Sequence, residues 1–211
     1  SCRSAAASAS SASMRMAALI GVTGALLYAF YGLAAADYSD RPDVERYLAQ
    51  VSAEHGFQHA DLVALFKDAE RKQNVIDAIS RPAEKAKPWY EYREIFVTDT
   101  RIEEGVEFWR ANAAALKRAE EQFSVPPEIV VAIIGVETRY GRNAGSYRVL
   151  DALSTLAFDY PPRGDFFKGE LTEFLLLARE EGVDPRSLVG SYAGAMGYGQ
   201  FIPSSFRTYA V

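Results

Sequence analysis

The stretch VVAIIGVETRYG, residues 130–141, decides the fold class. It also raises the question of why a carboxylate stands at the end of an apolar helix. Every residue before Glu137 is apolar or glycine, and a carboxylate then ends the run. Pro126 and Pro127 precede it, and proline suits the first turn of an α-helix. A helix that is apolar on every side is expected to be buried on every side. We therefore predict a buried helix, capped by Ser124 and closed by Gly141, with one carboxylate near its end.

The segments around this helix have apolar residues at three- and four-residue spacing, which is typical of amphipathic helices. Few segments alternate as strands do. The residues TRIE at 100–103 have the pattern of a capping box and are expected to open a long helix. Further helices are expected at 42–51, 60–70, 73–80, 147–158, 165–181 and 185–192. The predicted fold class is mainly α.

Composition excludes several function classes. The chain has 211 residues, 49% of them hydrophobic, which is enough for one packed domain or two small ones. A net charge of −5 argues against nucleic acid as a partner, because phosphate binding needs a basic surface. A single cysteine, Cys2, makes a disulfide or a cysteine nucleophile a poor interpretation. His55 and His59 could hold a metal at helical spacing, but no further His or Cys ligand is present. We favour a solvated helix end there.

Residues 1–36 are expected to be a leader rather than part of the fold. Arg15 precedes an apolar run from residue 17 to residue 33, and alanines at 34–36 fit a signal-peptidase site. Residues 1–13 are interpreted as an upstream extension. Cleavage would release a periplasmic protein that begins at Asp37. Retention of the apolar run as a membrane anchor is the alternative, since its length is close to the lower limit for spanning a bilayer.

The carboxylate of Glu137 suggests acid catalysis. A carboxyl group held against apolar neighbours loses solvation of its charged form, so we predict that its pKa rises. A glutamic acid that keeps its proton near neutral pH can protonate a leaving group, which glycoside cleavage requires. The alternative is a structural role in which Glu137 only pairs with Arg139 or Arg142 at the helix end.

A second stretch, GSYAGAMGYGQFIPSSF at residues 190–206, has the character of a sugar site. It holds four glycines, which let a backbone approach a ligand closely. Tyr192 and Tyr198 offer flat faces for sugar rings, as does Phe201, and Ser191 and Gln200 offer hydrogen bonds. The alternative is a tight turn between helices with aromatic core residues.

Four stretches together resemble the lytic murein transglycosylase B family. They are PPEIVVAIIGVETRYGR, LDALSTLAFDYPPR, FFKGELTEFLLLARE and GSYAGAMGYGQFIPSSFRTYAV. The resemblance runs from about Trp89 to Val211 and is weaker before that. It implies a lysozyme-like catalytic core, which we assign to residues 121–211, behind an N-terminal helical region at 37–120.

This resemblance implies a specific reaction. The family cleaves the β-1,4 bond between N-acetylmuramic acid and N-acetylglucosamine in peptidoglycan, without water and without a cofactor. The muramyl 6-hydroxyl attacks its own anomeric carbon and leaves a 1,6-anhydro sugar. The family's catalytic glutamate matches Glu137, which would first protonate the leaving oxygen and then accept the proton of the 6-hydroxyl.

The resemblance also implies roles for residues that bind the glycan strand. Ser191 matches a serine that faces the glycan, and Gln200 matches a glutamine in the same groove. Tyr92 matches an aromatic residue close to the cleaved bond. Arg163 matches the second of two neighbouring arginines, the first of which is Pro162 here, and a nearby tyrosine of the family is Phe166. These departures concern the outer subsites.

The chain stops at Val211, whereas the family continues with an acidic metal-binding loop and a tyrosine-containing wall of the groove. We therefore expect a core that is C-terminally truncated relative to the family, and no metal site in this chain. The expected partner is the peptidoglycan glycan strand, bound by a monomer. No cell-wall synthesis partner can be named.

Three alternatives stay open. A hydrolytic muramidase would use the same glutamate with water and give reducing ends. A glycan-binding protein without turnover would bind peptidoglycan without dissolving it. A purely structural helical scaffold would do neither.

Overall fold

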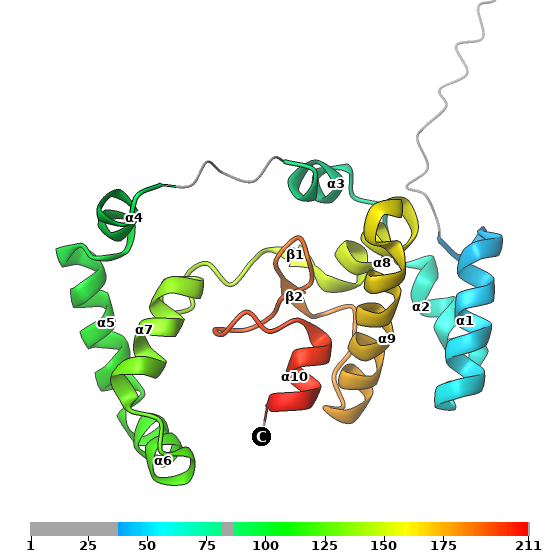
Figure 1. The fold of residues 1–211 in the computed structure, drawn as a ribbon. Coiled ribbons are helices and arrows are strands. Elements are labelled where there is room, and N and C mark those ends of the chain that lie inside the picture. Colours follow the sequence, from blue (N-terminus) through cyan, green and yellow to red (C-terminus); the bar gives the residue numbers. More distant parts are fainter. Residues whose placement is uncertain (1–37, 82–86, 211) are drawn as a thin grey trace, which may run out of the picture. The chain divides into compact units, whose positions relative to one another are not determined.

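The computed structural model describes residues 38–81 and 87–210 (Figure 1). All of the described residues belong to one compact unit. The predicted leader, residues 1–36, and Cys2 lie outside the described residues. Within the described ranges, no helix combines the length and the apolar character that crossing a membrane requires.

The predicted mainly α class is confirmed. The helices are α1 (Pro42–His55), α2 (His59–Lys67), α3 (Gln73–Ile79), α4 (Trp89–Phe96), α5 (Asp99–Ala111), α6 (Ala113–Phe123), α7 (Pro127–Thr138), α8 (Val149–Asp159), α9 (Gly164–Glu180) and α10 (Pro203–Tyr209), with short 3-10 helices at η1 (Tyr38–Asp40) and η2 (Pro161–Arg163). Two short strands, β1 (Tyr147–Arg148) and β2 (Val189–Gly190), pair antiparallel, with Tyr147 opposite Gly190.

The main core is built around α8. Every residue of this helix from Val149 to Ala157 is buried, and α9 packs beside it (Figure 1). Helices α1 and α2 supply further apolar side chains to the same cluster. Its largest fully buried members include Tyr38, Phe66, Phe167, Phe174, Leu48, Leu150, Leu153, Leu156 and Leu171. The cluster thus joins residues from both sides of the expected division at residue 120, and that division stays a prediction.

Polar groups inside this core tie the segment after α2 to α8. The buried carboxylate of Asp151 accepts hydrogen bonds from the backbone N–H of Glu70 at 2.9 Å and from Arg148 at 2.6 Å. The hydroxyl of Thr155 accepts one from the backbone N–H of Lys72 at 2.9 Å. Buried polar groups are costly unless they are paired, so these bonds fix the register between the two segments.

Helices α5, α6 and α7 pack against one another. Two glycines, Gly105 on α5 and Gly135 on α7, leave room for the side chain of Tyr140. A Cβ built on either would lie within 2.7 Å of the Tyr140 hydroxyl. Arg101 on α5 also donates to the carbonyl oxygen of Gly135 at 3.0 Å. The end of α7 is therefore held on α5 by ring packing and by a hydrogen bond.

The prediction that α7 is buried all round is wrong. Val131 and Gly135 are buried, but Ile129, Ile133 and Val136 are exposed, with Ile133 at 52%. Among the described residues, α5 and α6 cover only one side of this helix. The composition of a helix indicates which faces are apolar, but not which of them receive a neighbour.

Two predicted helix ends are also wrong. Ser124 adopts a left-handed conformation at φ 56° and ends α6, whereas Pro127 opens α7 as expected. The side chain that caps α5 is Thr98, which accepts from the backbone N–H of Arg101 at 3.3 Å, and not Thr100. The expected long helix is interrupted at Asn112, whose side chain donates to the carbonyl of Phe108 and competes with the helical hydrogen bonds.

The expected helix at 185–192 does not form. The backbone N–H and the hydroxyl of Ser187 both donate hydrogen bonds to the carbonyl oxygen of Asp184, at 3.0 Å and 2.7 Å. Strand β2 follows this turn. The partner strand β1 takes the first two residues of the helix that was expected at 147–158.

Candidate active site

Glu137 lies one residue before the end of α7, which ends at Thr138. The chain then turns through two left-handed residues, Arg139 at φ 50° and Tyr140 at φ 60°, followed by Gly141 at φ 85°. Such conformations are unfavourable for side chains other than glycine. The turn that follows Glu137 is therefore held in place by contacts rather than by local preference. The expected closure of α7 at Gly141 is wrong, because two non-glycine residues make the left-handed turn first.

The side chain of Glu137 is exposed and, within the described residues, forms no hydrogen bond or ion pair. The expected shielding of this carboxylate by apolar neighbours is wrong, because the side of α7 that bears it is not covered in the described structure. The glutamate is instead accessible and unpaired. A carboxyl group in this state can approach a ligand from solvent.

The structural alternative for Glu137 is wrong as well. Arg139 and Arg142 do not pair with it, because Glu104 on α5 binds both of them. Arg139 donates from Nε and Nη2 to the two oxygens of Glu104, each at 2.7 Å, and Arg142 donates from Nη1 at 2.6 Å. Sequence reasoning missed Glu104, which is one of several acids in a charged helix.

Thr138 joins α7 to the glycine-rich stretch at 190–206. Its hydroxyl is fully buried and lies 3.0 Å from the carbonyl oxygen of Tyr198 and 3.2 Å from that of Ile134. It accepts a hydrogen bond from the backbone N–H of Gly141 at 2.9 Å. The two stretches that carry the predicted chemistry therefore meet directly behind Glu137.

Ser191 organises the turn at the start of the glycine-rich stretch. Its hydroxyl oxygen accepts hydrogen bonds from the backbone N–H groups of Ala193 at 3.2 Å and Ala195 at 3.1 Å. The hydroxyl proton is not used in these bonds and can be donated to a ligand. Ser191 thus has a structural role that sequence reasoning did not anticipate, and its contact with glycan stays a prediction.

Gln200 ties the other end of the stretch to the loop after α7. Its amide nitrogen donates to the carbonyl oxygens of Ala144 at 3.1 Å and Gly197 at 3.0 Å, and its backbone is left-handed at φ 51°. Both donors of the amide are occupied, so a ligand would meet its carbonyl oxygen.

Two glycines allow these loops to touch. A Cβ on Gly145 would lie 2.0 Å from the carbonyl oxygen of Gly190, directly before Ser191. A Cβ on Gly141 would lie 2.3 Å from the ring of Tyr198. The positions of Ser191 and Tyr198 beside the α7 turn therefore depend on residues without side chains.

Tyr198 and Tyr192 are exposed, at 53% and 39% of their surface. The ring of Tyr198 meets that of Phe108 edge-on, with 6.0 Å between centroids. The alternative in which these rings are core residues of a turn is therefore wrong. Exposed rings next to backbone hydrogen-bonding groups are typical of sugar sites.

In the part of the chain that the structure describes, Tyr92 and Arg163 form no hydrogen bond or ion pair with Glu137. The ring of Tyr92 contacts Trp89 and Phe96 on its own helix, α4. The guanidinium of Arg163 lies 4.2 Å from the ring centre of Phe166, an attractive cation–π distance. Among the described residues, neither forms a hydrogen bond, ion pair or ring interaction with the stretch at 190–206, and their roles stay predictions.

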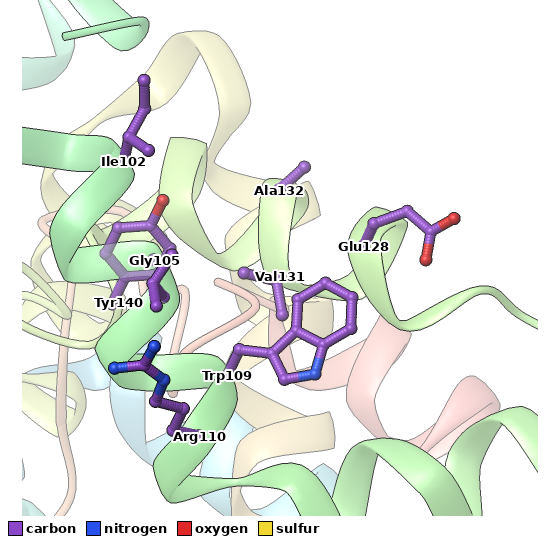
Figure 2. Close-up of a pocket in the computed structure, with 9 residues that line it drawn as sticks. Ile102, Gly105, Trp109, Arg110, Glu128, Val131, Ala132 and Tyr140 are labelled. Atoms are coloured by element: carbon purple, nitrogen blue, oxygen red, sulfur yellow. The ribbon is translucent and has the colours of Figure 1, made fainter. Parts of the chain in front are cut away.

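A pocket of about 610 Å³ lies between α5 and α7 (Figure 2). Its apolar wall includes Trp109 and Val131, and Glu128 and Arg110 stand at its edge in Figure 2. Glu137 is not among the residues that line it. The pocket shares Tyr140 with the turn that follows Glu137, and sequence reasoning did not anticipate it.

The two histidines do not share a helix. His55 ends α1 and His59 begins α2, with Gly56 in a left-handed conformation between them. His59 lies 3.1 Å from Glu45. Within residues 38–81 and 87–210, no three His, Cys, Asp or Glu side chains gather in a way that could hold a metal ion.

The chain belongs to the transglycosylase SLT domain family, whose model matches residues 39–211. This finding confirms the resemblance that the sequence motifs indicated.

Three relatives document the likeness. Membrane-bound lytic murein transglycosylase B of Escherichia coli strain K12 is 45% identical over 184 residues, which are 83% of this chain and 51% of the relative. The X-ray structure of catenated lytic transglycosylase SltB1 from Pseudomonas aeruginosa is 61% identical, with a TM-score of 0.81 over 83% of this chain and 58% of that one. SltB3 from the same species, solved in complex with NAG-NAM-pentapeptide, is 28% identical, with a TM-score of 0.72 over 80% and 45%.

These likenesses confirm the predicted lysozyme-like, mainly α core with an N-terminal helical region. The chain spans about half the length of the curated relative it matches.

Proposed function

We propose that the protein is a lytic transglycosylase that cleaves the β-1,4 bond between N-acetylmuramic acid and N-acetylglucosamine of peptidoglycan. The observation that carries the proposal is the state of Glu137, which is exposed and unpaired while both neighbouring arginines are bound by Glu104. Membership of the transglycosylase SLT domain family supports it. So do the names of the relatives, two of which are lytic transglycosylases.

The proposed reaction uses one carboxyl group twice. Glu137, protonated, donates its proton to the bridging oxygen as the bond to the anomeric carbon of the muramyl residue breaks. Its carboxylate then accepts the proton of the muramyl 6-hydroxyl, whose oxygen bonds to the same carbon. The products are a 1,6-anhydromuramyl end and a free 4-hydroxyl on N-acetylglucosamine, and the acid is regenerated. No second carboxylate is needed, since the nucleophile belongs to the substrate.

The glycan strand is proposed to lie along the loop that Thr138 fastens to α7. Ser191 would donate its free hydroxyl proton to the sugar, and Gln200 would accept through its carbonyl oxygen. The exposed rings of Tyr192 and Tyr198 would stack on sugar faces. Tyr92 and Arg163 are proposed to bind more distant parts of the strand.

We further propose a periplasmic location, reached through a leader at residues 1–36, and action as a monomer on peptidoglycan strands. The apolar run at residues 17–33 and the small residues after it support this location. Retention of the run would leave the protein anchored, and the relative from Escherichia coli is named membrane-bound.

The test is digestion of purified peptidoglycan by the 211-residue chain, with mass spectrometry of the soluble products. We expect anhydromuramyl products from the parent and none from Glu137→Gln. Glu128→Gln, an exposed acid on the same helix, serves as the matched control and should act like the parent. Reducing-end products would instead make the protein a hydrolytic muramidase. Binding without products would make it a glycan-binding protein.

A further inference from the structure

One carboxylate beneath the end of α7 binds two arginines at once. Glu104 is 7% exposed, and each of its oxygens accepts a hydrogen bond from Arg139, one of them a further bond from Arg142. Bidentate pairing of a guanidinium with a carboxylate combines directional hydrogen bonds with charge attraction and is the strongest form of this contact. We name the group of Glu104, Arg139 and Arg142 the arginine clamp.

The clamp acts on the turn that directly follows Glu137. Arg139 stands two residues after Glu137, in a left-handed conformation that a non-glycine residue adopts only when its surroundings hold it. Tyr140, also left-handed, fills the space left by Gly105 and Gly135 between the helices. The clamp and the tyrosine ring together fix where α7 ends relative to α5.

The clamp also engages the two cations that lie nearest to Glu137 in the sequence, Arg139 and Arg142. A guanidinium is charged at every physiological pH, and close to a carboxylate it favours the ionised form. A general acid has to carry a proton at the start of the reaction. If Glu104 released it, either arginine would be a cation close in the chain to the exposed, unpaired carboxylate of Glu137.

We propose that Glu104 is a positioning residue for Glu137, which holds Arg139 and Arg142 on α5 and so keeps the catalytic carboxyl group free of a cationic partner. The inference rests on the proposed function of Glu137 as acid and base. Arg101 on α5 adds a third positive charge near Glu104, and Glu107 reaches Arg142 only at 3.9 Å, so Glu104 is the principal anion of this group.

The first test compares Glu104→Gln with Glu107→Gln, a matched change three residues along the same helix at an exposed side chain. With the parent and Glu137→Gln assayed beside them, we expect Glu104→Gln to lower kcat by about tenfold or more while KM changes less than about twofold. Glu107→Gln should leave both constants unchanged. Equal kcat in Glu104→Gln and the parent would overturn the inference.

A rescue experiment separates this role from a merely structural one. The triple variant Glu104→Gln, Arg139→Gln, Arg142→Gln removes the cations together with the anion and buries no unpaired charge. We expect it to recover much of the kcat that Glu104→Gln loses. If the clamp served only to hold the fold, the triple variant would lose as much as the single variant or more. The triple variant also keeps the test decisive if Glu104→Gln alone does not fold, because loss of kcat in a folded triple variant contradicts the proposal.

Crystal structures of Glu104→Gln and the triple variant give a readout that needs no turnover. We expect the guanidinium of Arg139 or Arg142 within about 4 Å of the Glu137 carboxylate in the single variant, the usual ion-pair distance. Guanidinium groups that stay away from Glu137 would overturn the inference. An inactive parent would refute the proposed function alone, and the crystal structures would then decide the inference about Glu104.

Discussion

The hydroxyl of Thr138 lies 3.0 Å from the carbonyl oxygen of Tyr198, and this contact joins the helix of Glu137 to the loop of Ser191 and Gln200. The same hydroxyl accepts from the backbone N–H of Gly141. One buried side chain thus satisfies backbone groups from two segments that are far apart in the sequence. It also sets the spacing between the proposed acid and the proposed sugar-binding loop.

Thr138→Val is expected to destabilise the protein by about 1–3 kcal/mol. The replacement keeps the shape but leaves the N–H of Gly141 and the carbonyl of Tyr198 buried without their partner. Urea unfolding followed by circular dichroism measures the change. Thr208→Val is the matched control, since its hydroxyl also bonds to a helical carbonyl, that of Ser204, but is exposed. Similar losses in both variants would contradict a special role for Thr138.

Gly145→Ala is expected to destabilise the protein by more than the backbone strain of a left-handed position alone. A Cβ at Gly145 would collide with backbone atoms of Gly190 and Ser191, which cannot move aside as a flexible side chain can. Gly182→Ala separates the two effects, because Gly182 is also left-handed but has nothing within 4 Å of its Cβ position. We expect a loss of about 1–2 kcal/mol for Gly182→Ala from backbone strain. Thermal unfolding of both variants measures the change. Gly145→Ala should lose clearly more stability than Gly182→Ala, and it should also lose peptidoglycan cleavage.

Stability is expected to fall in acid partly through Glu104. Hydrogen bonds from Arg139 hold the pKa of the Glu104 carboxyl below its usual range, burial opposes this, and the charges of Arg139, Arg142 and Arg101 add to the lowering. A pKa that is lower in the folded state stabilises the protein above the unfolded value, about 4.3 for Glu, and this contribution is lost as the pH falls through the folded pKa.

The stability difference between the parent and Glu104→Gln should therefore be largest near pH 6 and shrink below about pH 4. Urea unfolding at several pH values measures it, with Glu107→Gln as the exposed control. A difference that does not change with pH would mean that the carboxylate of Glu104 is not preferentially ionised in the folded state.

The helices of the core were predictable because their apolar pattern is strong and local. The helix expected at 165–181 differs from α9 by one residue at each end. The helix expected at 185–192 failed because β2 depends on pairing with β1, about forty residues earlier in the chain, which no local pattern records. Likewise, the amino-acid sequence of α7 indicates which faces are apolar, but not which of them packs against another helix.

The sequence identified the site residue whose local context is unusual. It did not identify residues whose roles depend on partners distant in the chain. Glu137 could be singled out as the one carboxylate at the end of an apolar run, and the family motifs pointed to the same residue. Glu104 could not, because its partners stand 35 and 38 residues away and an acid in a charged helix is normally solvated. Thr138 and Gly145 were missed for the same reason, since their function lies in contacts across the chain.

Two roles of Ser191 can be separated by substitution. Its oxygen accepts two backbone hydrogen bonds, whereas its proton is free for a ligand. Ser191→Ala removes both roles and is expected to lower stability by about 1–2 kcal/mol and to weaken glycan binding. Ser191→Asp keeps an acceptor for the turn but has no proton to donate when ionised.

We therefore expect Ser191→Asp to unfold near the temperature of the parent but to bind glycan as weakly as Ser191→Ala. Binding is measured by co-sedimentation with insoluble peptidoglycan in the Glu137→Gln background, so that the strand is not cut during the assay. The melting temperature of each variant is measured on the same samples. Full binding by Ser191→Asp would mean that the serine contributes only to the shape of the loop. Full binding by Ser191→Ala would remove Ser191 from the proposed glycan site, because neither the turn nor the hydroxyl proton would then be needed.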